Sequence, residues 1–177
     1  MRPFTDIVAP FLGKPSWQVL WDDQTNLDLN FGAARLLIRE PKQSDSPHPK
    51  VRALAARRQV TLRGEYWLWI YLARWKIVLR DGRAATGASS ARQRNIVCAN
   101  LTGEKVIRID VAPGNGATTF AFDLGAVLHV RRLSPTEPED MWLLYFPNGY
   151  ILAVRGDGHY SYHRATAREA QVRWKPV

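Results

Sequence analysis

The sequence predicts a mainly β (α+β) fold, an antiparallel β-sandwich or open barrel of about ten short strands with one substantial helix. Apolar and polar residues alternate in many short segments, and glycine-containing turns separate these segments. Helical spacing of apolar residues extends over only one long stretch. The chain has no alternating series of strands and helices, which argues against a doubly wound nucleotide-binding fold.

The first part of the chain predicts a short helix followed by strands. Apolar residues recur at helical spacing over residues 4–12, before a glycine and a proline interrupt the pattern. Residues 17–21 and 27–31 then alternate between apolar and polar side chains, which is typical of half-buried strands. Residues 36–38 continue the strand pattern after a break at Gly32.

Residues 41–50 contain three prolines and no apolar anchor, which predicts a mobile, proline-rich surface loop. This loop is not expected to be a domain linker, because the 40 residues before it are too few for an independent core. We therefore expect residues 1–177 to form a single domain. Residues 50–58 predict one or two helical turns, and residues 166–177 predict a polar tail.

The strand predicted over residues 65–73 has two apolar faces. Tyr66, Leu68, Ile70 and Leu72 are expected on one face, and Trp67, Trp69 and Tyr71 on the other. Such a strand is either covered on both sides or uses its second face as a binding surface.

The one substantial helix is predicted over residues 89–101. Ser89 or Ser90 can cap its start, and Gly103 follows its end. Its apolar stripe is expected to consist of Ile96, Val97 and Leu101. Six further strands follow, over residues 106–111, 118–122, 127–130, 142–146, 150–154 and 159–163, and Pro147–Gly149 is the clearest hairpin turn.

The residue types of common catalytic sites do not occur in patterns that indicate catalysis. His159 and His163 lie four apart in a predicted strand, so roughly 13 Å separates them and one metal ion cannot bind both. Cys98 is expected to be a buried, inert thiol, because it lies beside apolar residues of the predicted helix. We expect no catalytic residue, no metal site and no cofactor.

Cellular location is inferred from what the sequence lacks. A single cysteine excludes an internal disulfide and fits a reducing compartment. We see no secretory signal and no apolar run long enough to span a membrane. These observations favour a cytoplasmic protein without a membrane span.

The net charge of +9 is concentrated in the middle of the chain. Residues 41–100 contain 12 basic and 3 acidic side chains, and therefore carry a charge equal to the whole excess. Such a block attracts acidic proteins, nucleic acids or other polyanions, although a solvated arginine-rich surface has the same composition.

Within this block, basic and aromatic residues are interleaved over residues 57–80. The candidate binding residues are Arg57, Arg58, Arg63, Arg74, Trp67 and Trp69. We interpret them as a surface for an acidic protein partner, because tryptophan and arginine are enriched where proteins bind each other. Single-stranded nucleic-acid binding is the alternative, since aromatic stacking and cations serve it too. Three further interpretations are a barrel that binds a small ligand, an enzyme, and an ordinary core with a charged rim.

Five segments of the chain form a recognisable set: Leu12–Trp17, Leu29–Gly32, Arg57–Val60, Trp67–Tyr71 and Phe122–Gly125. This set resembles a family of bacterial proteins to which no function is assigned. The resemblance covers nearly the whole chain and implies a bacterial, cytoplasmic, single-domain protein. It implies no activity and no site residue.

Overall fold

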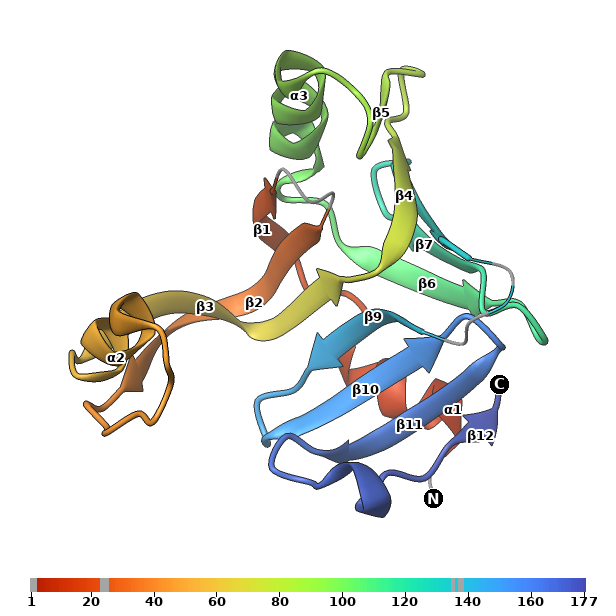
Figure 1. Ribbon diagram of the computed structural model, residues 1–177. Coiled ribbons are helices and arrows are strands. Elements are labelled where there is room, and N and C mark those ends of the chain that lie inside the picture. The colour runs from red at the N-terminus through yellow and green to blue at the C-terminus, as the bar shows by residue number, and fades with distance from the viewer. Residues whose placement is uncertain (1–2, 23–25, 135, 137–138) are drawn as a thin grey trace.

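The computed structural model describes residues 3–22, 26–134, 136 and 139–177, and these residues form a mainly β structure with two antiparallel sheets (Figure 1). One sheet has seven strands in the order β1-β2-β3-β9-β10-β11-β12, and the other has five in the order β5-β4-β8-β7-β6. The predicted fold class is therefore confirmed, with twelve strands in the described residues where the sequence predicted about ten.

The seven-stranded sheet consists of β1 (Ser16–Trp21), β2 (Leu27–Arg39), β3 (Gln59–Ile70), β9 (Asp140–Tyr145), β10 (Tyr150–Arg155), β11 (His159–Arg164) and β12 (Lys175–Pro176). The five-stranded sheet consists of β4 (Ala73–Val78), β5 (Ala84–Thr86), β6 (Val106–Val111), β7 (Thr118–Phe122) and β8 (Val127–Arg132). The helices are α1 (Phe4–Val8), α2 (Pro49–Ala55) and α3 (Ala91–Leu101), with 3-10 turns η1 (Ala9–Phe11) and η2 (Glu169–Gln171). Among the described residues, every helix is too short or too polar to cross a membrane.

The core lies where the two sheets meet. Trp142 on β9 is fully buried, and its ring packs edge-on against Phe120 on β7, with 5.3 Å between the ring centroids. The indole Nε1–H of Trp142 also donates a hydrogen bond to Oγ1 of Thr118 at 2.8 Å. The two sheets are thus joined by both packing and a buried hydrogen bond.

Helix α3 begins where the sequence predicted. The hydroxyl of Ser90 accepts a hydrogen bond from the backbone N–H of Gln93 at 3.3 Å, which is an N-cap contact. The buried stripe differs from the prediction, because Ile96 is exposed and Cys98 takes its place beside Val97 and Leu101. The prediction that Cys98 is buried is confirmed.

The chain crosses from one sheet to the other between β3 and β4 (Figure 1). Tyr66, Leu68 and Ile70 are buried, as predicted for one face of this strand. The same prediction for Leu72 is wrong: this residue is exposed and has a positive φ of 46°. Leu72 forms the corner between the sheets, so the alternation of faces starts again at Ala73.

The tail has more structure than its composition indicates. Lys175 pairs with Tyr160, so β12 adds an edge strand next to β11. The guanidinium of Arg155 lies 4.3 Å from the ring centroid of Trp174, which anchors the segment before β12.

Candidate functional site

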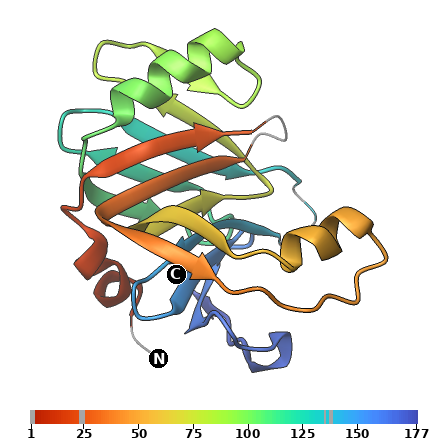
Figure 2. The same ribbon diagram turned by 90° about the vertical axis from the view of Figure 1, so that its left-hand side faces the viewer.

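Strands β2 and β3 extend well beyond the body of the protein, and α2 lies at their far end (Figure 1). Figure 2 views the molecule from the side toward which they extend. We call residues 33–64 the arm: it comprises the outer halves of both strands, α2 and the connecting segments. Residues 41–48 of the loop predicted over residues 41–50 contain no helix or strand, whereas Pro49 and Lys50 already belong to α2. Helix α2 confirms the helical turns predicted over residues 50–58.

The arm begins at an irregularity in the β2–β3 pair. Phe31 pairs with Tyr66, but the next pair is Ala34 with Gly64, so β2 has one extra residue here. The backbone N–H of Gly64 donates to Oδ1 of the buried Asn30 at 2.8 Å. A Cβ at Gly64 would lie 2.5 Å from the carbonyl oxygen of Tyr66, so only glycine fits.

Beyond this point the two strands form a ribbon with two different faces. Its register pairs Arg35 with Arg63, Leu36 with Leu62, and Ile38 with Val60. Side chains alternate along a strand, so Leu36, Ile38, Val60 and Leu62 share one side, which we call the aliphatic face. The opposite side is the cationic face: Arg35, Leu37, Arg39, Gln59, Thr61 and Arg63.

The aliphatic face continues the core side of β3. Val60 and Leu62 have the same strand parity as Tyr66 and Leu68, which are buried in the core. Past the body, no described residue buries this side, and Leu36, Ile38, Val60 and Leu62 are 64%, 53%, 56% and 45% exposed. Four adjacent aliphatic side chains in water are unfavourable, and such patches are typical of interaction sites.

Both edges of the ribbon are unpaired in the part of the chain that the structure describes. Strand β1 pairs with β2 only between Leu27 and Phe31, and β9 pairs with β3 only between Trp67 and Ile70. Residues 34–39 and 59–66 therefore each have one side on which no strand pairs. Unpaired edges of this kind can accept a strand from another chain.

The aromatic residues lie on the outer face of the seven-stranded sheet, next to the cationic face. Trp67 stacks on Tyr145 with 4.3 Å between centroids and on Trp69 with 6.0 Å, and Trp69 lies 4.5 Å from Tyr71. The guanidinium of Arg63 lies 4.4 Å from the centroid of Trp67. These half-buried rings thus cover one another's faces, and Arg63 connects them to the arm.

A carboxylate lies among these rings. Asp28 accepts a hydrogen bond from Nε1–H of Trp67, and burial raises the pKa of its carboxyl above the ordinary value. Arg63 acts in the opposite direction, favouring the charged form. Burial, and secondarily the charge of Asp28, raises the pKa of Tyr145.

The far end of the arm is cationic as well. Arg58 forms an ion pair with Glu40 at 2.9 Å, and both side chains are exposed. Arg57 is exposed between α2 and β3, and Val51 and Leu54 of α2 are exposed beside it in sequence. The whole arm contains eight basic and two acidic residues, giving a net charge of +6.

The structure separates the six residues that the sequence suggested as one surface. Arg63, Trp67 and Trp69 lie together at the root of the arm, whereas Arg57 and Arg58 lie at its far end. Arg74 lies beyond the corner at Leu72, on β4 of the other sheet, where it lines a separate cavity.

Sequence reasoning missed the aliphatic face. Leu36 and Ile38 were expected only as strand residues, because alternation does not reveal whether anything covers a face. The sequence does contain two strand-like segments with arginines, one on each side of the proline-rich loop. Two such segments joined by a loop indicate a hairpin whose strands are exposed.

Histidine, cysteine and carboxylate residues do not gather into a metal-binding group in the described ranges. His159 and His163 lie in β11, which confirms the strand predicted there. Comparison of the chain with models of known protein families, with curated proteins and with solved structures gives no match.

Proposed function

We propose that this protein is a binding module whose arm pairs with an extended, acidic and aliphatic segment of a protein partner. The observation that carries the proposal is the continuation of the core face onto the arm, where Leu36, Ile38, Val60 and Leu62 are exposed. A partner that covers these side chains removes them from water. Moving an aliphatic side chain from full exposure to full burial contributes roughly 1.5–3 kcal/mol, and these half-exposed side chains would contribute a part of that.

The charge of the arm supports an acidic partner. Arg35 lies directly opposite Arg63, and like charges in this position repel each other. Among the described residues, neither arginine has an ion pair. Carboxylates from a partner would relieve this repulsion and increase the rate of association.

The unpaired edges support a partner that binds as a strand. A strand added beside residues 34–39 or 59–66 would direct alternate side chains to the two faces of the ribbon. Aliphatic residues would then extend the aliphatic face, and acidic residues would extend the cationic face. The partner segment is therefore expected to alternate acidic and aliphatic residues over one strand length.

Other occupants fit these features less well. A second copy of the chain would bring two arms of net charge +6 together. Single-stranded nucleic acid needs open ring faces for base stacking, whereas the rings of Trp67, Trp69 and Tyr145 lie against one another. An aliphatic face has no role in binding a phosphate backbone.

The test is a titration of the protein into labelled peptides of about ten residues, roughly the upper strand length in globular proteins. The probe alternates glutamate and valine, and fluorescence anisotropy measures its binding. One control peptide has the same composition with glutamates and valines in separate blocks, and the other alternates lysine and valine. We expect only the alternating acidic peptide to bind.

The two matched variants each replace two arginines by glutamates, one on the arm and the other outside it. The double variant Arg35→Glu, Arg63→Glu is expected to weaken binding at least about tenfold, whereas Arg92→Glu, Arg173→Glu should leave it unchanged. Arg92 and Arg173 are exposed and lie outside the arm. Equal loss in both variants, equal binding of all peptides, or tighter binding of a short single-stranded RNA would overturn the proposal.

A further inference from the structure

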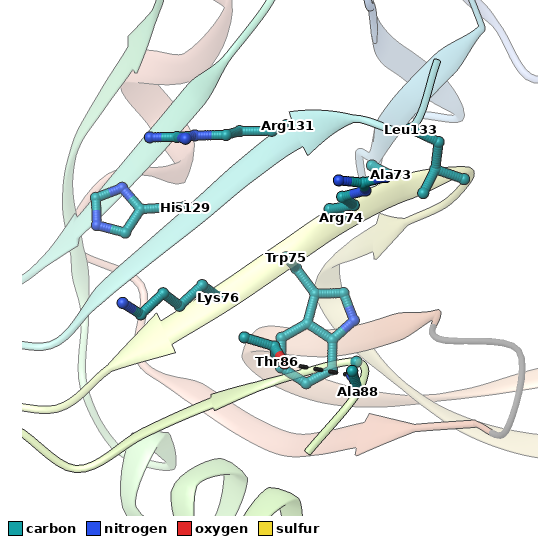
Figure 3. Close-up of a pocket in the computed structure, with 10 residues that line it drawn as sticks. Ala73, Arg74, Trp75, Lys76, Thr86, Ala88, His129, Arg131 and Leu133 are labelled. Carbon is teal, nitrogen blue, oxygen red and sulfur yellow. Dashed lines mark hydrogen bonds between the residues drawn. The ribbon is translucent and has the colours of Figure 1, made fainter.

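The outer face of the five-stranded sheet contains a cavity, and every residue that lines it lies outside the arm. It has a volume of about 660 Å³, which is in the range of small-molecule sites. Strands β4 and β8 form its floor, and Thr86 at the end of β5 with the next two residues, Gly87 and Ala88, forms one wall. Figure 3 shows the side chains of Lys76, His129 and Arg131 extending to the same side of these strands, while Trp75 extends to the other.

Basic residues face each other in two neighbouring pairs in this cavity. The β4–β8 register places Arg74 opposite Arg131 and Lys76 opposite His129. Directly opposed like charges destabilise a sheet, and the Arg74–Arg131 pair has Lys76 as a third cation at a neighbouring position on the same face. No acidic residue lines the cavity, and within the described ranges Arg74, Lys76 and Arg131 form no ion pair with a carboxylate.

We propose that this cavity is a binding site for a small organic molecule that carries a multiply charged oxyanion, a phosphoryl or polycarboxylate group. Two guanidinium groups and an ammonium group on one surface match several anionic oxygens, since guanidinium groups bind such oxygens in pairs. Leu133 and Ala73 at the end of the cavity provide apolar contacts for the organic part.

The groups around His129 also support an anion site. Burial, then the charges of Arg131 and Lys76, lower the pKa of its imidazole. A hydroxyl faces its other side, because Oγ1 of Thr119 on β7 lies 3.4 Å from Nδ1. Asp110 lies opposite Thr119 in the β6–β7 pair, and its carboxylate forms an ion pair with Arg108 at 2.8 Å. A bound anion is therefore the counter-charge that this group of cations lacks.

The experiment measures binding by calorimetry at constant ionic strength, with pyrophosphate, inorganic phosphate, phenyl phosphate, citrate and acetate as probes. We expect the multiply charged probes to bind and acetate not to bind. Phenyl phosphate should bind more tightly than inorganic phosphate, because its ring can contact Leu133. Binding of phosphoryl compounds alone, or of citrate alone, supports the site and identifies which anion it takes.

Variants separate a binding role from a structural one. Arg131→Gln and Lys76→Gln are expected to weaken binding by about ten- to a hundredfold, because each removes a charged hydrogen bond. Both residues are exposed, so the variants should fold, and relief of repulsion should keep or raise the melting temperature without ligand. The control Arg92→Gln should bind normally.

Three results would overturn the proposal. The first is that none of the multiply charged probes binds. The second is that Arg92→Gln weakens binding as much as Arg131→Gln does. The third is that a short single-stranded RNA binds this face more tightly than every small probe, which would identify a polynucleotide surface instead.

Discussion

Leu36 lies directly opposite Leu62 in the β2–β3 pair, and both leucines are exposed although the same side of β3 is buried from Tyr66 onward. A sheet normally ends where its apolar face stops being covered, because uncovered aliphatic side chains and free strand edges favour aggregation. Here β2 and β3 continue beyond the core with exposed aliphatic side chains and with unpaired strand edges. The proposed protein partner would cover both the aliphatic side chains and a free strand edge.

Self-association of the isolated protein should depend on salt. At low ionic strength the net charge of +6 on each arm keeps the aliphatic faces of two molecules apart, and salt screens this repulsion. We expect sedimentation velocity to show a monomer at low salt and larger species at high salt.

The double variant Leu36→Ser, Ile38→Ser is the control for this prediction. It should stay monomeric at both salt concentrations, with a free energy of unfolding within about 0.5 kcal/mol of the unmodified protein, because both residues are exposed. If the variant associates as readily as the unmodified protein, the aliphatic face is not the contact.

The buried hydrogen bond between Trp142 and Thr118, which joins the two sheets, should contribute measurably to the free energy of unfolding. Thr118→Val removes the acceptor for the indole N–H of Trp142, and leaves that buried donor unpaired. We expect the free energy of unfolding in urea to fall by about 1–3 kcal/mol. Thr61→Val on the exposed arm is the matched control, and it should change this value by less than about 0.5 kcal/mol.

Local chemistry explains which parts of the fold could be predicted. The cap at Ser90, the hairpin at Pro147–Gly149 and the buried Cys98 follow from short-range signals, and the structure contains each of them. The corner at Leu72 could not be predicted, because an apolar residue inside an alternating pattern gives no sign of a positive φ.

The site was harder to predict than the fold. Arg63 and Arg74 lie eleven positions apart in sequence, but the corner between them places one at the arm and the other in a cavity of the second sheet. The pairing of Arg74 with Arg131 joins strands that are distant in sequence, so only the register reveals it.

Cys98 should react slowly in the folded protein. Burial raises the pKa of its thiol to about 11, so at about pH 8 roughly one molecule in a thousand carries the thiolate. We expect its reaction with a thiol-specific disulfide reagent to be at least about a hundredfold slower than in denaturant, where one thiol should titrate. Equal rates in the two conditions would contradict the buried position.

Two histidines should make stability depend on pH. Burial lowers the pKa of His163, and burial together with Arg131 and Lys76 lowers that of His129. The unfolded chain therefore binds more protons than the folded one as pH falls through the ordinary histidine range near about 6.5, and the free energy of unfolding decreases. The melting temperature should fall between about pH 7.5 and 6, and fall less in the double variant His129→Gln, His163→Gln. Identical pH profiles would contradict this account.

Hydrogen exchange at the arm tests the central claim most directly. The amides of residues 34–39 and 59–66 would be followed with and without the alternating glutamate–valine peptide. Strand addition predicts that amides along one of these two edges become protected, every second residue most strongly, while the outer strands β6 and β12 exchange as before. Peptide binding that leaves both edges of the arm unprotected would contradict the account.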